Sequence, residues 1–145
     1  MAEVAHLFIC PGHRKPMQEF DEVWALLHRG IEGCNHARPQ SSRQVLLVDT
    51  ETLENLGLEP GVIKENVTVT GMNVSVLEPG VQIRLGEAEF RVTGVCEPCF
   101  RMDEIRPGLQ RALDGRRGIL CRVIKEGRIV RGDRVELVPA AAAQN

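Results

Sequence analysis

The chain has 145 residues, enough for one domain with a hydrophobic core and too few for two ordinary ones. Apolar residues make up 43% and charged residues 26%, a globular balance, while a net charge of −2 and only four Phe, one Trp and no Tyr argue against nucleic acid as a partner. No run is long enough for a membrane span, and residues 4–11 lack the basic start and cleavage site of a signal peptide, so we expect a cytoplasmic protein without a membrane partner.

The N-terminal part predicts a strand, a helix and a loop. Residues 4–10 are a short apolar run that predicts a buried strand. Residues 16–28 are predicted as an amphipathic helix because apolar side chains recur at helical spacing. These side chains are Phe20, Val23, Trp24 and Leu27. Residues 34–42 are polar and contain Pro39, so we expect an exposed loop.

A strand and a short helix are predicted next. Residues 44–49 form a nearly continuous apolar strand. The helix that follows has Asp49 or Thr50 as its N-cap and ends at Gly57. Val67 and Val69 predict a further strand.

The remaining chain predicts alternating strands. Residues 81–85 and 88–92 predict a hairpin around Gly86, with one apolar and one polar face. Residues 107–113 predict one or two helical turns. Further along we expect a second hairpin (119–125 and 128–130), a last strand (134–138) and a disordered tail (139–145).

Many short strands with glycine-containing turns and few helices are typical of a small β-barrel. We therefore predict a mainly β fold, a small closed or nearly closed barrel with a few short helices. Residues 1–138 are predicted to form this single domain.

Cys96 and Cys99 form a Cys-x-x-Cys pair, and Pro98 stiffens the loop between them. The pair is compatible with half of a zinc site, a dithiol redox switch, one thiolate on a transition metal, or two thiols without a ligand. A zinc site needs two more ligands, for which Cys34 and His36 are candidates. A thioredoxin-like role is disfavoured because the pair follows a hairpin rather than opening a helix. Five cysteines in a chain of this length favour reduced thiols.

Polar side chains suited to anions lie elsewhere in the sequence. Asn66 can donate to an oxygen-rich ligand or serve as a turn residue. Four arginines are candidates for contacts to a phosphate or a pterin, since a guanidinium binds such groups with two hydrogen bonds. They are Arg43, Arg101, Arg116 and Arg117, and each alone is compatible with an ordinary surface position.

Five motifs occur in the order found in MOSC domains, which are named for the C-terminal domain of molybdenum cofactor sulfurases. They are RQVLLVD (43–49), KENVTVTG (64–71), Leu77-x-x-Gly80, GVCEPC (94–99) and GRIVRGDRV (127–135). The resemblance covers residues 16–138. It departs from the family at residues 30–35, where Cys34 stands in place of an Asp usual in short members.

The resemblance implies a barrel similar to that of pyruvate kinase, and binding of molybdenum cofactor (molybdopterin). Relatives such as the mitochondrial amidoxime-reducing component reduce N-hydroxylated compounds, and Cys99 matches the cysteine that supplies their thiolate to molybdenum. Asn66 matches an asparagine that contacts the cofactor. We predict Cys99 as the catalytic residue and metal ligand, with Asn66, Arg43, Arg101 and Cys96 as cofactor contacts.

The predicted function is therefore reduction of a small N-hydroxylated molecule, or the handling of sulfur, at Cys99. The sequence has no flavin or nicotinamide fingerprint, so reduction needs an electron-donor reductase as a partner. The alternatives are a carrier that binds the cofactor without catalysis, and a zinc-stabilised barrel without redox activity.

Overall fold

The computed structural model describes residues 1–139. The fold is mainly β with a few short helices, as predicted. The strands are β1 Glu3–Ile9, β2 Gln18–Phe20, β3 Glu22–Leu26, β4 Gly30–Ile31, β5 Val45–Asp49, β6 Val67–Thr70, β7 Gln82–Leu85, β8 Ala88–Val95, β9 Ile119–Lys125, β10 Gly127–Val130 and β11 Val135–Leu137. The helices are α1 Thr50–Asn55, the 3-10 helix η1 Val74–Val76, α2 Arg101–Ile105 and α3 Leu109–Ala112. Of the predicted tail, residues 140–145 lie outside the described residues.

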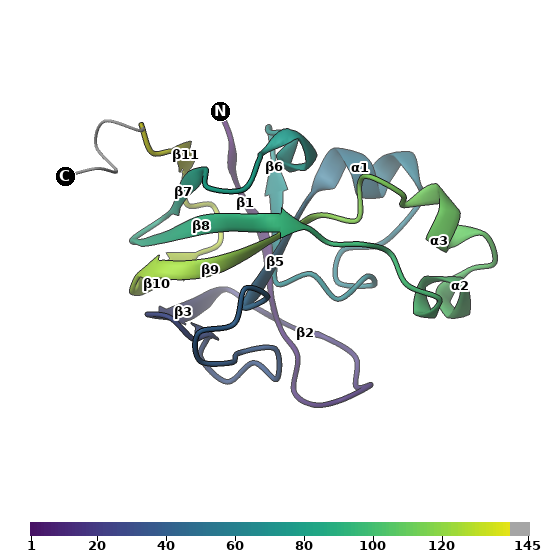
Figure 1. Cartoon of the computed structure of the whole chain (residues 1–145), viewed down its shortest axis with the longest axis horizontal. Coiled ribbons are helices and arrows are strands. Elements are labelled where there is room, and N and C mark those ends of the chain that lie inside the picture. Colours follow the sequence, from purple (N-terminus) through teal and green to yellow (C-terminus); the bar gives the residue numbers. More distant parts are fainter. Residues whose placement is uncertain (140–145) are drawn as a thin grey trace.

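The strands form two sheets. One has eight strands in the order β11-β7-β8-β9-β5-β6-β1-β2, and the other has three in the order β10-β3-β4. All pairs are antiparallel except β5 with β6, which α1 connects. Helices α1, α2 and α3 gather at the end of the molecule opposite β10 and β11 (Figure 1). None of the helices within residues 1–139 has the length and apolar character needed to cross a bilayer.

The predicted closed barrel is not found in residues 1–139, where both sheets are open. The start of β1 does approach the start of β11 through one isolated bridge, Glu3 to Arg134. Two backbone hydrogen bonds flank it, from Val4 N to Asp133 O (2.8 Å) and from Val135 N to Ala2 O (3.0 Å). Within the described chain this contact stays an isolated bridge and does not extend into a ladder.

The predicted helix at residues 16–28 is wrong, since this segment forms β2 and β3. In β3, Val23 and Ala25 are buried while Glu22 and Trp24 are exposed, which is the two-residue period of a strand. Phe20, Trp24 and Leu27 gave the sequence its helical spacing, but they are 40%, 42% and 43% exposed. The apparent helical face is therefore not a core face.

The predicted hairpin between residues 119–125 and 128–130 is also wrong. Both strands exist, but β10 pairs with β3, whereas β9 pairs with β5 and β8. Gly127 lies so close to the β7–β8 turn that a Cβ there would be 2.7 Å from the carbonyl carbon of Glu87. Only Glu126 separates β9 from β10, whereas the tightest common hairpins have a loop of two residues, so the chain does not turn back onto β9. By contrast, the β7–β8 hairpin, the strands near residues 4–10, 44–49, 67–69 and 134–138, and the short α1 and α3 helices are confirmed.

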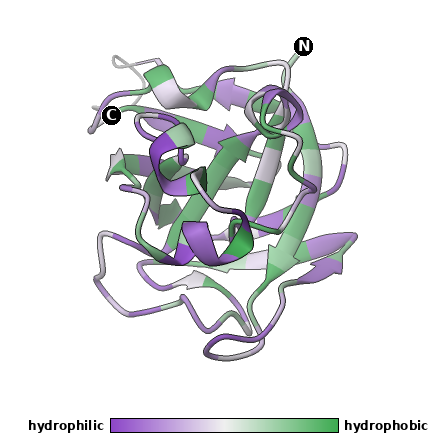
Figure 2. Cartoon of the chain, turned by 90° about the vertical axis from the view of Figure 1, so that its right-hand side faces the viewer, coloured by the Kyte–Doolittle hydropathy of each residue, from purple (hydrophilic) through white to green (hydrophobic). Residues whose placement is uncertain are grey.

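Strand β5 is buried on both faces and divides the interior. Val45 and Leu47 belong to the main core between the sheets, whereas Val48 packs with the helices. Leu46 forms a small third cluster with Cys96 and Leu120. Figure 2 looks onto the helical side and shows the apolar strands behind its more polar helices and loops. The Leu46 cluster forms part of the wall of the cavity described below.

We expect Gly118→Ala to lower the free energy of unfolding by at least about 2 kcal/mol, because strain of this kind costs roughly 1–3 kcal/mol before any clash is counted. Gly118 has φ +108°, and a Cβ there would lie 2.5 Å from the carbonyl oxygen of Leu47. Gly115→Ala is the matched control, since Gly115 also has a positive φ (+78°) but nothing within 4 Å of its Cβ position. Equal losses for the two variants in urea unfolding would contradict this account.

Candidate functional site

Two cavities lie next to each other at the helical end of the large sheet. The first has a volume of about 370 Å³ and the second about 550 Å³. Four basic residues line both cavities, namely Arg14, Lys64, Arg101 and Arg117. The two spaces are therefore parts of one region with a basic boundary between them.

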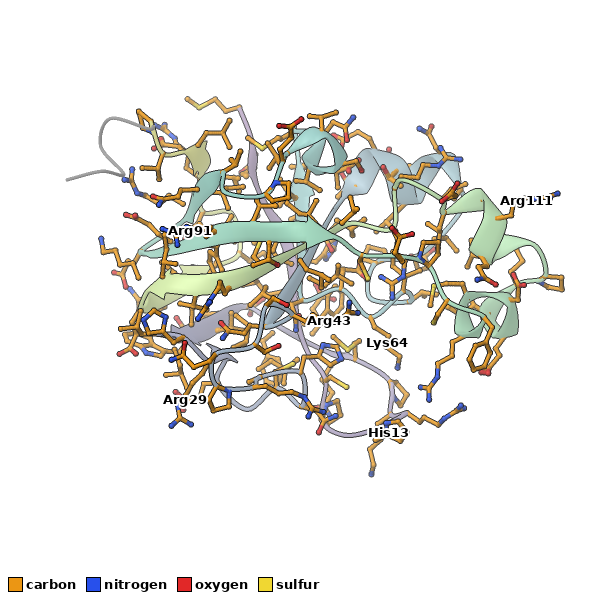
Figure 3. All side chains as sticks on the ribbon, in the orientation of Figure 1. His13, Arg29, Arg43, Lys64, Arg91 and Arg111 are labelled. Atoms are coloured by element: carbon orange, nitrogen blue, oxygen red, sulfur yellow. The ribbon has the colours of Figure 1, made fainter. Side chains whose placement is uncertain are left out.

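The first cavity is strongly basic. Six Lys or Arg residues line it, and no Asp or Glu does. Besides the four boundary residues they are Arg38 and Arg43, and two histidines, His13 and His36, add to them. Figure 3 labels His13, Arg43 and Lys64, which come from three separate loops. Within residues 1–139, only Arg14 of the six basic residues forms an ion pair, 3.7 Å from Glu104. This charge is available to an anionic ligand.

Arg117 is the buried member of this basic group. It is only 7% exposed, and its Nε and Nη1 atoms have no hydrogen-bond partner within residues 1–139. A guanidinium carries five N–H donors and a fixed charge, so burial without acceptors is costly. An anion in the cavity would provide these acceptors.

Glu65 does not complete an ion pair with Arg117. Its Oε2 accepts hydrogen bonds from Gly61 N (2.7 Å) and Thr68 Oγ1 (3.2 Å), while Oε1 has no partner within the described chain. Burial raises the pKa of Glu65, against these hydrogen bonds and the charge of Arg117. Glu65 therefore only partly compensates the Arg117 charge.

Asn66 lines the first cavity, but its side chain is fully occupied by protein contacts. Its Oδ1 accepts from Leu46 N (3.1 Å), and its Nδ2 donates to Phe8 O and to Cys34 Sγ, both at 3.2 Å. These bonds tie the end of β1, strand β5 and the loop after β4 to one another. In the structure Asn66 thus builds the cavity wall.

Cys34 is buried, although residues 34–42 are predicted to form an exposed loop. Its side chain is 7% exposed, and Sγ accepts from Asn66 Nδ2 and from the backbone N–H groups of Cys10 (3.4 Å) and His36 (3.5 Å). Burial raises its pKa, but the His36 side chain and the backbone hydrogen bonds from Cys10 and His36 outweigh that effect and lower the pKa from 9.0 to about 7. The polar loop sequence does not reveal this because two of the donors, Cys10 and Asn66, come from other segments.

The Cys-x-x-Cys thiols point into different surroundings. Cys96 is buried, packs with Leu46 and Leu120, and lines the first cavity. Cys99 is exposed and lines the second cavity instead. The predicted zinc site of Cys96, Cys99, Cys34 and His36 is not formed, since residues 1–139 contain no group of three or more His, Cys, Asp or Glu arranged to hold a metal.

The predicted arginines divide into two groups. Arg43 and Arg101 line the first cavity together with Asn66 and Cys96, so four of the five predicted site residues meet there. Arg117 also lies in that wall, whereas Arg116 donates to Ala112 O (3.0 Å) and lines neither of these two cavities. Whether these residues bind a cofactor stays a prediction.

Sequence reasoning missed several lining residues. Cys10, His13, Arg14 and Arg38 belong to the first cavity but carried no motif. Cys10 and His13 lie in the loop that follows β1. Their position just after a predicted strand is the sequence feature that could have identified them, because binding residues are common in such loops. The second cavity has an apolar side that no pattern indicated. Its apolar members include Phe8, Met17, Val62, Met102 and Ile105.

Comparison with known proteins agrees with this fold. The family model of the MOSC domain matches residues 35–136. The YuaD protein from Bacillus subtilis has 24% identity and a TM-score of 0.78, over 94% of this chain and 96% of that one. YiiM from Escherichia coli has 21% identity and a TM-score of 0.71, over 96% of this chain and 70% of that one. YiiM from Geobacillus stearothermophilus has 19% identity and a TM-score of 0.76, over 98% of this chain and 78% of that one. At these identities the structures establish the fold alone. No curated protein matches the sequence.

Glu65→Gln should remove a pH-dependent loss of stability. With its pKa raised above 4.5, Glu65 keeps in the folded state a proton that the unfolded chain releases. The free energy of unfolding of the native protein therefore falls as pH rises from 4.5 towards the raised pKa, by about 1.4 kcal/mol for each pH unit in that range.

The advantage of Glu65→Gln over the native protein should accordingly grow across this pH range in urea unfolding. Glu59→Gln is the control, because Glu59 is exposed in the same loop region. Stability curves of Glu65→Gln and native protein that stay parallel would contradict the assignment.

Proposed function

Because the chain belongs to the MOSC domain family, we propose that it binds molybdenum cofactor at the two adjoining cavities and acts as a reductase of small N-hydroxylated molecules. The observation that carries the proposal is the first cavity, lined by six basic residues and no acidic one, with buried Arg117, whose Nε and Nη1 have no acceptor within residues 1–139. Such a wall fits a phosphate-bearing pterin.

The donor set fits the two ends of this cofactor. Phosphate oxygens suit the first cavity, where Arg43, Arg101 and Arg117 can donate several charge-assisted hydrogen bonds. Thiolate is a soft ligand suited to molybdenum, and Cys99 is the exposed thiol of the adjoining cavity. Arg101 lines both spaces and favours the anionic form of ligands in either one.

The second cavity provides the features of a substrate site. When bound, the cofactor supplies the two-electron chemistry at its metal. Phe8, Met102 and Ile105 line the cavity and would hold the apolar body of a substrate and exclude water. Lys64 and Arg101 at the boundary would orient its polar group. The electrons come in this proposal from a separate reductase.

A second candidate is a protein that carries the cofactor, or its sulfur, without reducing a substrate. One observation favours it: Cys99 does not line the basic cavity that contains the other four predicted site residues. A reductase assay with an artificial electron donor separates the two candidates. Turnover of an N-hydroxylated compound supports the reductase, and full cofactor content without turnover supports the carrier.

Arg117→Met should lower cofactor content at least tenfold in protein made in a host that synthesises the pterin, a loss of about 1.4 kcal/mol in binding. The substitution keeps much of the apolar stem but removes the donors. The melting temperature should not fall, because an unpaired buried charge is removed. Arg91→Met is the control, since Arg91 is exposed on β8 and lines neither cavity (Figure 3). Undiminished pterin content in Arg117→Met would overturn the proposed phosphate site.

Cys99→Ser should lose molybdenum while keeping its fold. Cys99 is exposed, so the hydroxyl is tolerated, but a neutral alcohol is a poor ligand for this metal. Elemental analysis of the purified variant, with a thermal unfolding curve beside it, measures both properties. Molybdenum at the native level in Cys99→Ser would show that this thiol is not the ligand.

A further inference from the structure

Two buried cysteines outside the proposed cofactor ligands lie beside each other at the first cavity. Cys10 lines the cavity, and Cys34 lies behind three lining residues that it contacts, Cys10, His36 and Asn66. The backbone N–H of Cys10 donates to Cys34 Sγ at 3.4 Å, and Asn35 N donates to Cys10 O at 2.8 Å. An N–Cα bond measures about 1.5 Å, so Cys34 Sγ lies within about 5 Å of the Cys10 Cα. The two cysteines are therefore neighbours in space, and a disulfide between them requires their Cα atoms to come within about 4.4–6.8 Å of each other.

The hydrogen bonds around the Cys34 sulfur are of the kind that suits a thiolate anion. Three N–H groups point at it, from Asn66 Nδ2, Cys10 N and His36 N. Hydrogen bonds to the charged form of a group favour that form. Cys10 Sγ instead donates to Gly12 O at 3.1 Å. Donors are therefore directed at the Cys34 sulfur, whereas the Cys10 sulfur is itself a donor.

The cavity beside this pair selects for negative charge. Cys10, His36 and Asn66 all line the first cavity, and each of them contacts Cys34. Arg117, 7% exposed and with two donor atoms unpartnered in the described chain, lines the same space. No carboxylate lines the cavity to oppose an incoming anion.

We propose that Cys34 is a thiol–disulfide exchange site for small anionic disulfides, with Cys10 as the second thiol that resolves the mixed disulfide. Cys99 takes no part in this exchange. The anionic disulfide would enter the first cavity, which the proposed function gives to the cofactor phosphate, so the exchange is a reaction of protein without bound cofactor.

The exchange proceeds in two balanced steps. The Cys34 thiolate attacks one sulfur of R–S–S–R, an S–S bond forms to Cys34, and R–S⁻ leaves. Cys10 then loses its proton to solvent and attacks Cys34 Sγ, which forms the Cys10–Cys34 disulfide and releases the second R–S⁻. Counted from the Cys34 thiolate and the Cys10 thiol, the protein loses two electrons and one proton, and the small disulfide is reduced to two R–S⁻ groups that take up protons from solvent.

Acidity supports the assignment of the attacking sulfur. The pKa of Cys34 is about 7, and thiols with a pKa near the ambient pH attack disulfides fastest. Burial raises the pKa of Cys121, which no N–H donor offsets, so that thiol is expected to stay inert. Cys34 also retains 7% exposure, whereas Cys121 has none.

The test is incubation of the reduced protein at pH 7 with glutathione disulfide, which is anionic, and separately with cystamine, which is cationic. Peptide mapping by mass spectrometry should find the Cys10–Cys34 disulfide, formed about tenfold faster with glutathione disulfide at low ionic strength. The ratio should shrink in salt, because salt screens the charge of the cavity. Mixed disulfide on exposed Cys99 is expected with both reagents and without this preference.

Two cysteine variants identify which thiols take part in the exchange. Cys10→Ser should stop at a glutathione mixed disulfide on Cys34, and Cys121→Ala, a control at a thiol that lines neither cavity, should still form the Cys10–Cys34 bond. Reaction confined to Cys99, mixed disulfide on Cys96 rather than Cys34, or equal rates with the two reagents would each overturn the proposal. The peptide mapping of the native protein tests the proposal even if one of these variants does not fold.

Discussion

The structure around the cavities depends on the side-chain amide of Asn66. Its oxygen accepts from Leu46 on β5, and its nitrogen donates to Phe8 on β1 and to Cys34 in the loop after β4. The Asn66 backbone bonds to the same two strands, through Phe8 N (2.7 Å) and Leu46 O (2.9 Å). A buried amide whose donors and acceptor are all used fixes its neighbours, because loss of any partner leaves a polar atom unsatisfied. The cavity wall is therefore rigid where β1, β5 and this loop meet.

Charge in this region is left partly uncompensated within the described chain. Arg117 is buried, yet Glu65 directs Oε2 to Gly61 and Thr68 and does not pair with it. Leaving one member of a buried ion pair alone typically costs on the order of 3–5 kcal/mol. The fold bears part of that cost in the absence of an anion. Unmet donors of this kind cluster where a ligand completes the hydrogen bonds.

Local sequence patterns predicted where strands form better than which strands pair with each other. The β7–β8 hairpin followed from alternation around Gly86, and the Asp49 cap followed from its position before α1, where it accepts from Thr52 N at 2.9 Å. The β3 segment failed because exposed aromatic residues imitated a helical face. The pairing of β10 with β3 was missed because the two strands lie far apart in the sequence, and no local pattern encodes such a contact. In the site, single arginines were identifiable, but their common cavity required the tertiary structure.

The cysteines show why residue type alone did not define the chemistry. Cys121 and Cys34 are both buried, and burial by itself raises the pKa of each thiol. At Cys121 nothing opposes this effect. At Cys34, hydrogen-bond donors and the His36 side chain reverse it, so the local dipoles outweigh the loss of solvent. Cys96 and Cys99, only three positions apart, line different cavities because the chain passes from the end of β8 to the start of α2 between them. Spacing suggested that these two thiols act together, whereas the structure pairs Cys34 with Cys10, a residue 24 positions away.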